Sequence, residues 1–307
     1  MKTSLARALP SSPSAADSPG ERTAWGSIAL FCVLWSSAFA AAKVALHDCP
    51  PLILLTSRFL VAGVLMLALA AATGGLGRPG WRDLLGLAAL GMLNNALYLG
   101  LSWSGMATVS SAFTAVLIST NPLLTGLLAG PVLGEQVGWR KLAGLCLALA
   151  GVVLVLRSRF SGMHEDLHGT LLVVGGLLSL VTGTLAYKRI KPRAKLWTAT
   201  GVQALSGALA LLPFALSRES FGQVHLTASL LWSMAYTIVA VSMGGYALWF
   251  TILSRSSATS ASALHFLMPP LGLLFGWLVL DEPVSWLDMA GIAPIALGIW
   301  LATRRAN

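Results

Sequence analysis

Long apolar runs follow one another along nearly the whole chain, and this pattern limits the possible folds more than any other feature. Several runs exceed the roughly 18–20 residues that an α-helix needs to cross the hydrocarbon core of a lipid bilayer. Only 10% of the 307 residues are charged, whereas a soluble domain typically has about 25%. The chain therefore lacks the charges for a water-facing surface, and we predict an integral membrane protein.

Short turns rich in Pro, Gly, Ser and charged residues separate the runs, for example HDCPP, KRIKPRAK and LDEPVS. The pattern predicts membrane-spanning helices over residues 25–46, 51–73, 82–104, 108–130, 139–157, 168–188, 197–216, 228–253, 257–280 and 286–303. The fold class is therefore predicted to be all-α and integral to the membrane, with ten transmembrane helices.

Positive charges predict the orientation of these helices. Ten spans place both termini on the same side, and cytoplasmic loops of membrane proteins are enriched in Lys and Arg. Most of the 20 Lys and Arg residues fall on the side of the termini. Both termini are thus predicted to be cytoplasmic. The net charge of +9 is explained by this loop bias, and no nucleic-acid partner is expected.

One pattern occurs twice in the chain. The stretch PLLTGLLAGPVLGEQVGW begins at Pro122, and PPLGLLFGWLVLDEPVSW begins at Pro269, 147 residues later. At this offset the further matching pairs are Glu135 and Glu282, Val137 and Val284, Trp139 and Trp286, Gly144 and Gly291, and Gly151 and Gly298. The chain is predicted to contain a five-helix unit twice. Because five is odd, the second unit enters the membrane from the opposite side, and such inverted repeats are typical of secondary transporters.

The repeat predicts three parts of the chain. Residues 1–23, rich in Ser, Pro and Ala, are expected to form a disordered cytoplasmic tail. The first repeat covers residues 25–157 and the second covers residues 168–303. Glu135 and Glu282 lie in short turns before a helix, where a carboxylate can accept hydrogen bonds from exposed N–H groups. We therefore expect both glutamates to have structural roles.

The two glutamate turns, together with VLWSSAFAAAK in the first span and TSRFLVAG in the second, resemble the EamA-like drug/metabolite transporters over about residues 24–303. The resemblance implies a ten-helix carrier of the bacterial inner membrane, in a superfamily with exporters of aromatic amino acids. It implies a secondary transporter that exports small neutral or zwitterionic metabolites, with amino acids favoured, by alternating access. The sixth span, LLSLVTGTLAYKRI, lacks the WSS element, so an equal contribution of spans one and six stays open.

The charged residues weigh against three other kinds of transporter. All Asp and Glu residues lie in loops, in tails or at the ends of predicted helices. This disfavours a proton relay in mid-membrane and a multidrug exporter with a buried carboxylate. Lys43 and Lys188 end spans one and six on opposite faces of the membrane, so they cannot bind one phosphate together. A sugar-phosphate or nucleotide-sugar carrier is therefore also disfavoured.

No residue pattern within the predicted spans indicates catalysis or a metal site. The chain contains no GxSxG and no paired Asp in mid-membrane, and the stretch HEDLH at residues 164–168 lies in the turn before the predicted span 168–188 and not inside a helix, so neither enzymatic activity nor a catalytic residue is predicted. Cys32, Cys49 and Cys146 lack the spacing of a metal site and are odd in number. No cofactor and no metal are expected. The predicted partners are a small-molecule substrate and the lipid bilayer.

Polar side chains inside membrane spans are costly and mark candidate substrate sites. The candidates at matching places in spans three and eight are Asn94, Asn95, Tyr98, Ser242, Tyr246 and Trp249. We predict that those in each span share one helical face, with amides binding a polar group of the substrate and rings packing its apolar part. The alternative is that the polar groups hold helices together while Trp249 anchors the chain at the membrane interface.

Three more residues are candidates inside the spans. His265 is the histidine deep within a span, and it could couple transport to pH or simply be satisfied by a neighbouring helix. Trp35 offers a ring beside two hydroxyl groups. Both complete the predicted substrate-binding set, in which Tyr98 and Tyr246 face each other across a cavity. Arg58 can reach outward, pair with a carbonyl or meet an anionic substrate group, and its role is left open.

Overall fold

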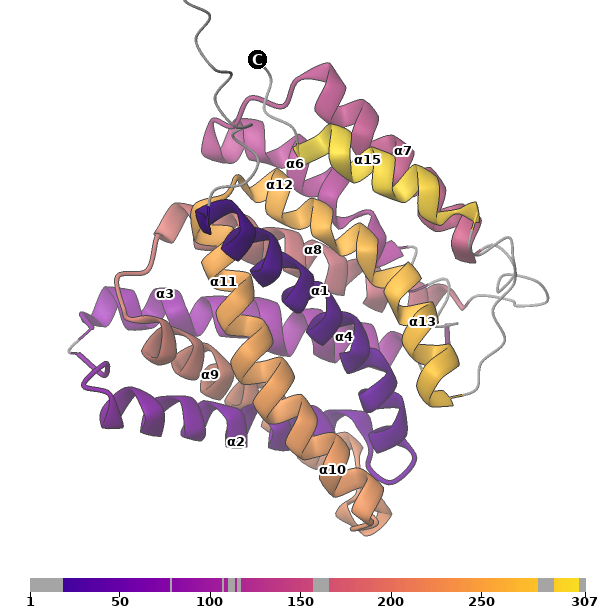
Figure 1. Ribbon diagram of the computed structural model, residues 1–307. Helices are drawn as coiled ribbons and strands as arrows, with labels where there is room; N and C mark the ends of the chain where they lie inside the picture. Colours follow the sequence, from indigo (N-terminus) through magenta and orange to yellow (C-terminus); the bar gives the residue numbers. More distant parts are fainter. Residues whose placement is uncertain are drawn as a thin grey trace, which may run out of the picture.

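The computed structural model describes residues 19–77, 79–106, 108–109, 114, 117–156, 166–280 and 290–303, and these residues contain helices but no strand. In the first half the helices are α1 (Pro19–Leu46), α2 (Pro51–Ala72), α3 (Trp81–Gly91), η2 (Met92–Leu97), α4 (Tyr98–Gly105), α6 (Asn121–Leu133) and α7 (Trp139–Leu156). In the second half they are α8 (Leu167–Ile190), α9 (Leu196–Arg218), η4 (Phe221–Gln223), α10 (Ala228–Tyr236), η5 (Thr237–Gly245), α11 (Tyr246–Arg255), α12 (Ala258–Ala263), η6 (Leu264–Leu267), α13 (Met268–Leu280) and α15 (Ile292–Thr303). Figure 1 shows their arrangement.

Seven helices within the described residues are long and apolar enough to cross a membrane: Gly26–Leu46, Pro51–Ala72, Trp81–Gly105, Leu167–Ile190, Leu196–Arg218, Ala228–Arg255 and Ala258–Val279. All seven overlap predicted spans. The predicted span 108–130 lies partly outside the described residues, as does 286–303, and there the structure describes the shorter helices Leu117–Leu133 and Ile292–Thr303. The all-α class is confirmed, and the count of ten spans stays a prediction.

The first helix begins earlier than the sequence indicated. We expected residues 1–23 to be disordered, but α1 begins at Pro19. Proline suits the first turn of a helix because its fixed φ is already helical and its missing N–H group would have no partner there. Residues 19–23 therefore have the composition of a disordered tail but form the first turn of α1.

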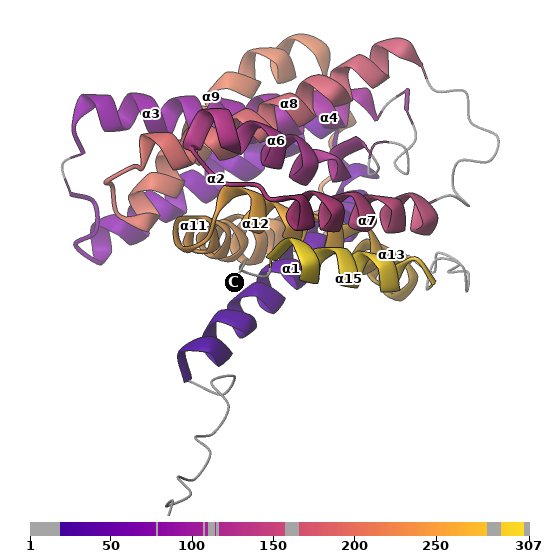
Figure 2. The same cartoon turned by 90° about the horizontal axis from the view of Figure 1, so that it is seen from above.

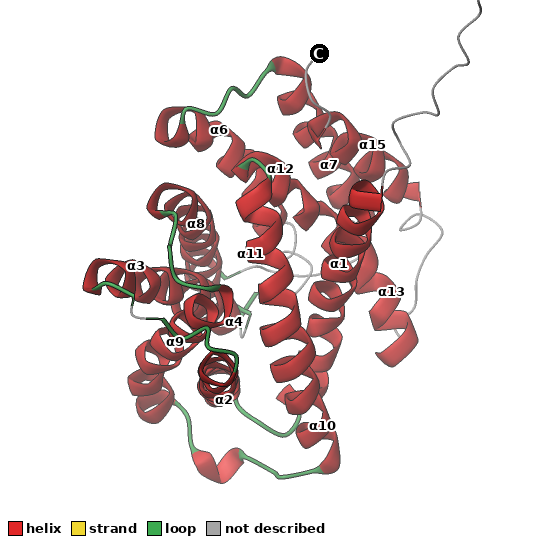
Figure 3. Ribbon diagram, turned by 60° about the vertical axis from the view of Figure 1, so that its left-hand side comes forward, coloured by secondary structure: helices red, strands yellow, loops and turns green. Residues whose placement is uncertain are grey.

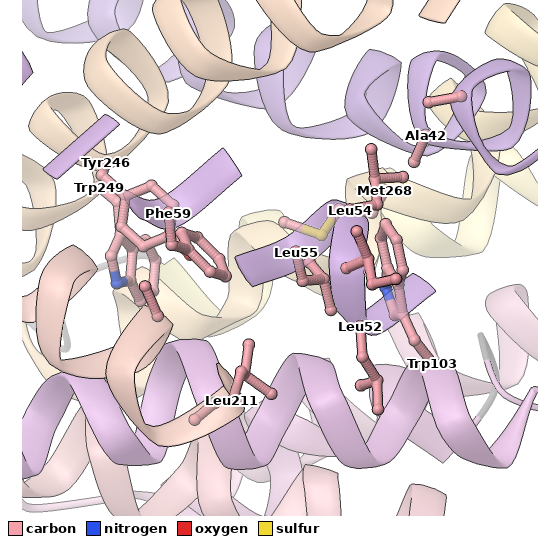
Figure 4. Close-up of a cluster of buried hydrophobic side chains, with 14 of the residues drawn as sticks. Ala42, Leu52, Leu54, Leu55, Phe59, Trp103, Leu211, Tyr246, Trp249 and Met268 are labelled. Carbon is pink, nitrogen blue, oxygen red and sulfur yellow. The ribbon is translucent and has the colours of Figure 1, made fainter. Parts of the chain in front are cut away.

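The helices form two layers (Figure 2), one with α2, α3, α4, α8 and α9 and one with α1, α7, α11, α13 and α15. Figure 3 shows α11 and α12 running between α8 on one side and α1, α7 and α15 on the other. A large cluster of buried apolar side chains fills the space between the layers. Phe59, Tyr246 and Trp249 lie together at one end of the cluster shown in Figure 4, and Trp103 and Met268 lie at the other.

Helices α7 and α15 pack with their backbones in close contact. A Cβ atom on Gly144 would lie 2.7 Å from the carbonyl oxygen of Gly298, and one on Gly151 would lie 2.9 Å from the carbonyl oxygen of Gly291. The two helices are antiparallel, since the partner number falls as the residue number rises. Gly144 matches Gly291 and Gly151 matches Gly298 at the repeat offset of 147. Gly144 therefore contacts the glycine that matches Gly151 in the repeat, and Gly151 contacts the glycine that matches Gly144.

Hydrogen bonds to a carboxylate and to a backbone carbonyl connect the loops at one end of the bundle. Glu219, just after α9, accepts from the backbone N–H groups of Leu52 (2.9 Å) and Ile53 (2.7 Å), which are exposed donors at the start of α2. The Asp48 carbonyl, in the turn between α1 and α2, accepts from the His225 N–H at 2.8 Å. These contacts bring the α1–α2 turn and the α9–α10 loop together, as expected for loops on one side of the membrane.

The opposite end uses the same kind of contact. Asp83 accepts from the N–H groups of Arg193 (3.2 Å) and Ala194 (3.0 Å). Glu135 accepts from the Ala258 N–H at 2.6 Å and from the Thr259 hydroxyl at 2.9 Å. Its carboxylate therefore binds the start of α12 and not the start of α7, which follows it in the sequence. The matching Glu282 lies outside the described residues.

Candidate functional site

Tyr246 lies at the centre of a buried group of polar and aromatic side chains. It is the first residue of α11, and its hydroxyl donates to the Asn95 Oδ1 at 2.9 Å. The Asn95 amide in turn donates from Nδ2 to the Gln203 carbonyl at 3.1 Å. Tyr246, Asn95 and Gln203 are all buried. The chain of hydrogen bonds thus joins η2, α9 and α11, three segments far apart in sequence.

Glycines allow η2 and α9 to approach closely enough for this contact. A Cβ atom on Gly207 of α9 would lie 2.5 Å from the Cβ of Asn95. A Cβ atom on Gly91, just before η2, would lie 2.1 Å from the Gln203 carbonyl oxygen. Neither position has room for a larger side chain. The Asn95 amide reaches the α9 backbone because these two glycines let the helices meet.

Two π-helical segments support the site, and they occupy matching places in the chain. Segment η2 ends just before Tyr98, and η5 ends just before Tyr246. These two tyrosines are 148 residues apart, close to the offset of the repeated pattern. π-helical turns inside α-helices are rare and occur frequently at functional sites. Each π-helical segment therefore independently indicates that the region around its tyrosine is a candidate functional site.

Aromatic rings connect α1, α11 and η6. The Trp35 ring lies 5.1 Å from the Tyr246 ring and 5.3 Å from the Phe31 ring, measured between centroids. Phe31 stacks on Trp249 at 5.5 Å, and the Trp249 and His265 rings are nearly perpendicular with their centroids 5.0 Å apart. These five rings form a continuous apolar wall beside the hydrogen bonds of Tyr246. Such a wall can pack an aromatic or aliphatic group.

His265 is buried in η6, four residues before the first of the two prolines that follow Met268. Its Nδ1 lies 3.0 Å from the Ser262 carbonyl oxygen. Because a carbonyl can only accept, Nδ1 is the donor in this contact. In the neutral imidazole the Nε2 atom is then an acceptor. The histidine is thus held by its own helix, and its ring contacts Trp249.

The predicted site residues separate into those near Tyr246 and those elsewhere. Trp35 and Asn95 contact Tyr246 directly, Ser242 lies one turn before it, and Trp249 and His265 are reached through the ring contacts. Asn94 lies apart from them, because its Oδ1 is against α8, where a Cβ atom on Gly183 would be 2.1 Å away. Asn94 and Asn95 therefore do not share one face as the sequence suggested.

The position of Tyr98 leaves one expectation untested. Its side chain is buried in α4, one turn after Asn95. Among the described residues, the rings recorded next to Tyr246 are Trp35, Phe59 and Phe250. The predicted opposition of Tyr98 and Tyr246 across a cavity stays a prediction.

Three site residues were missed from the sequence. Gln203 contributes its backbone carbonyl, which no side-chain pattern could have indicated. Phe31 and Phe59 contribute rings, and each looked like one of many apolar residues in its span. Only spacing hints at them, because Phe31 lies four residues before Trp35 and so on the same helical face.

An open hollow lies at the end of the bundle where α8 ends, α9 begins and α11 ends. Its volume is about 250 Å³, and its lining includes Tyr187, Thr200, Phe250 and Arg255. The Tyr187 and Phe250 rings are 4.7 Å apart on its wall, and Phe250 lies 6.2 Å from Tyr246. The Phe250 ring therefore lies between the hollow and Tyr246, whose hydroxyl binds Asn95.

Comparisons with known proteins agree with this arrangement. The profile of the EamA-like transporter family matches residues 24–157 and again residues 167–304. An "Uncharacterized transporter YvbV" of Bacillus subtilis is 27% identical over 282 residues, covering 91% of both chains. A "Probable amino-acid metabolite efflux pump" of Salmonella typhimurium is 25% identical over 288 residues, covering 89% of this chain and 92% of the relative. A solved crystal structure with 20% identity superposes with a TM-score of 0.76 over 92% of this chain and 96% of its own, which shows the same fold.

Proposed function

Because the chain belongs to the EamA-like transporter family, we propose that it exports small neutral or zwitterionic metabolites, chiefly amino acids including aromatic ones, by alternating access. It is a multi-pass membrane protein, and we assign it to the bacterial inner membrane with both termini in the cytoplasm. The substrate class is supported by relatives whose names describe probable amino-acid metabolite efflux pumps.

One observation carries the proposal: the buried group of rings and amides joins the two halves of the chain. Trp35 and Asn95 belong to the first matched segment, and Tyr246 belongs to the second. In carriers built from inverted repeats, the substrate site lies near the middle of the bilayer between the repeats. Rings that pack an apolar side chain beside an amide that binds a polar group suit an amino acid.

We propose further that residues 25–157 and 168–303 are inverted five-helix repeats. The antiparallel contacts of Gly144 with Gly298 and of Gly151 with Gly291 support this, because a two-fold axis between α7 and α15 would relate them. The two π-helical segments also occupy matching places. Single cysteines placed beside Glu135 and Glu282 should be labelled from opposite sides of the membrane. Labelling of both from one side would contradict the inversion.

In this mechanism the hollow near Phe250 is the cytoplasmic approach to the site. An amino acid would enter beside Tyr187, pass the Tyr187–Phe250 ring pair and reach Tyr246. Its side chain would pack on Trp35, and the Tyr246–Asn95 hydrogen bond would open so that both groups can bind the substrate. A relative movement of the two halves would then open the route to the other side.

Counterflow in proteoliposomes tests this function. The purified protein is reconstituted, loaded with an unlabelled amino acid and exposed to a trace of the labelled one. We expect labelled phenylalanine, tryptophan or tyrosine to accumulate transiently when the vesicles hold the unlabelled amino acid. Vesicles without protein and vesicles without internal amino acid serve as controls. If no member of a panel of amino acids exceeds these controls, amino-acid transport is wrong.

A further inference from the structure

Arg58 is a positive charge buried within a membrane span. It lies in α2, and only 6% of its surface is exposed. Its neighbours in the helix, Leu54, Leu55 and Phe59, are also buried. A charged side chain in such a place is costly unless other groups compensate it, and intramembrane charges usually serve a function.

The hydrogen bonds of Arg58 account for only part of its capacity. Its Nε donates to the Ser242 Oγ at 2.9 Å, and its guanidinium lies 5.4 Å from the Phe59 ring centroid. A guanidinium has five N–H groups, and no described residue is recorded as an acceptor for those on the two terminal nitrogens. These terminal groups form the planar fork that binds a carboxylate through two parallel hydrogen bonds.

None of the described carboxylates neutralises Arg58. The five whose side chains the structure describes are Asp48, Asp83, Glu135, Asp166 and Glu219. All five lie at helix ends or in loops, and each binds other groups. Glu219 and Glu135 accept from helix starts, Asp83 accepts from the α8–α9 loop, Asp48 accepts from the Thr227 hydroxyl and Asp166 accepts from the Gly169 N–H.

Arg58 also lies next to the substrate site proposed above. Its partner Ser242 is one helical turn before Tyr246, and the adjacent Phe59 ring lies 6.5 Å from the Tyr246 ring. A molecule whose apolar part packs on Trp35 and Tyr246 would therefore have a charged group within reach of Arg58. Trp35 and Asn95 are the other predicted site residues that contact Tyr246 directly.

We propose that Arg58 binds a carboxylate group of the transported molecule, so that the substrates are small carboxylates such as amino acids and not the corresponding amines. The inference rests on the proposed transport function and narrows its substrate class. Ser242 is a positioning residue, because its bond to Nε fixes the guanidinium and leaves the terminal fork for the ligand. The substrate then supplies a negative charge that none of the described carboxylates provides beside Arg58.

A series of related ligands tests the inference by binding to the purified full-length protein, measured calorimetrically in detergent. The series is L-phenylalanine, 3-phenylpropionate, L-phenylalaninamide and phenethylamine, which share a ring and differ in the carboxylate. We expect the two carboxylates to bind the wild-type protein about tenfold more tightly, or more, than the amide and the amine, as hydrogen bonds to charged groups predict. Equal affinities, or binding of none of the four, would overturn the inference.

Variants of Arg58 then identify the group responsible. Arg58→Gln should remove the preference for carboxylates, whereas Arg58→Lys should keep part of it, because a lysine retains the charge without the fork. Arg140→Gln, at an exposed arginine of α7, is the matched control and should keep the full preference. A preference that survives in Arg58→Gln would refute the assignment.

Two further measurements keep the result interpretable. If Arg58→Gln does not stay monodisperse, Ser242→Ala keeps the arginine but removes the bond that positions its guanidinium, and it should weaken carboxylate binding a fewfold without affecting the amine. An unchanged carboxylate affinity in Ser242→Ala would count against the positioning role. Counterflow of the wild-type protein with the amino-acid panel judges the transport function separately, so a transporter without carboxylate preference would be recognised as such.

Discussion

The centre of the bundle and its two ends are built from different chemistry. At the ends, Glu219 and Glu135 accept from the first N–H groups of α2 and α12, so their negative charges are matched by helix starts. At the centre, Tyr246 and Asn95 hydrogen-bond to each other within a wall of rings, and Arg58 has no described carboxylate beside it. At the ends the protein itself supplies the partners of the carboxylates, whereas at the centre the terminal nitrogens of Arg58 have no acceptor among the described residues.

This contrast predicts that the two regions control different properties. The ends join loops that are distant in sequence, so they should determine stability. The centre should determine substrate affinity, because its polar groups can exchange a protein partner for a ligand. Variants that change affinity without stability at the centre, and stability without affinity at the ends, would support the division.

The largest expected effect comes from shortening Tyr246. Tyr246→Ala removes a large buried side chain, and burial of such a side chain contributes about 1.5–3 kcal/mol. Affinity for an aromatic amino acid should fall by about tenfold or more, measured as the half-saturation concentration in counterflow. Tyr98→Ala tests the untested half of the predicted pair in the same assay.

Two controls refine this prediction. Tyr246→Phe keeps the packing and loses only the bond to Asn95, so its effect should be milder. Phe214→Ala removes a ring of similar size that is 56% exposed on α9 and should leave affinity unchanged. If Tyr246→Ala and Tyr98→Ala both transport normally at low substrate concentration, the site lies elsewhere.

Much of the fold could be predicted from the sequence, and the reason is local. The second span was predicted at 51–73 and is observed at Pro51–Ala72. Pro51 suits the first turn of a helix, and Gly74 adopts a φ of 62° just after its end, a conformation that glycine adopts easily. An apolar run between such residues specifies a membrane helix without reference to the rest of the chain.

The site was harder to predict because it depends on contacts between distant helices. Asn94 and Asn95 are adjacent in sequence, but the side chain of Asn94 packs against Gly183 of α8 and that of Asn95 packs against Gly207 of α9. The π-helical segments η2 and η5 are not encoded by apolar spacing, which indicates only that a helix is present. Glu135 was expected to have a structural role, but the helix start that it binds follows from tertiary packing alone.

The second prediction concerns the ends of the bundle. Glu219→Ala and Glu135→Ala each remove the acceptor at a helix start, and loss of a capping group costs about 0.5–2 kcal/mol. Both variants should therefore lower the melting temperature of the purified protein. Substrate affinity should stay at the wild-type value, since neither glutamate touches the centre. A Glu219→Ala variant that lost affinity while keeping its melting temperature would contradict the division between centre and ends.

A smaller effect is expected from pH at Asp48, in the turn between α1 and α2. The hydrogen bond from the Thr227 hydroxyl lowers the pKa of the Asp48 carboxyl, and the Ser229 hydroxyl and the nearby His225 and His47 also favour the charged form. A lowered pKa in the folded protein means that the contribution is present at neutral pH and is lost as the pH falls through that lowered pKa.

The measurement is the melting temperature of wild-type protein and Asp48→Asn between neutral pH and about pH 3. The wild-type protein should be the more stable at neutral pH, and the difference should shrink as the carboxyl becomes protonated. Asp48 is only partly buried, so salt should reduce the difference as well. A difference that grows on acidification would show that the carboxylate is unfavourable in the folded protein.

The smallest effect is expected from removing the proton gradient. Arginine stays protonated at all physiological pH values, and none of the carboxylates described by the structure lies in the middle of a span. The charge at the centre should therefore not change during transport, and counterflow should continue as exchange when an ionophore abolishes the pH difference. His265 is the group to which an opposite result would point, since it is buried beside Trp249 and its imidazole can bind a proton. The opposite result would be uptake that stops when only the gradient is removed and that becomes independent of the gradient in His265→Gln. That pair of results would make this histidine the coupling residue. It would also show that a group at the centre changes its protonation during transport, contrary to the prediction.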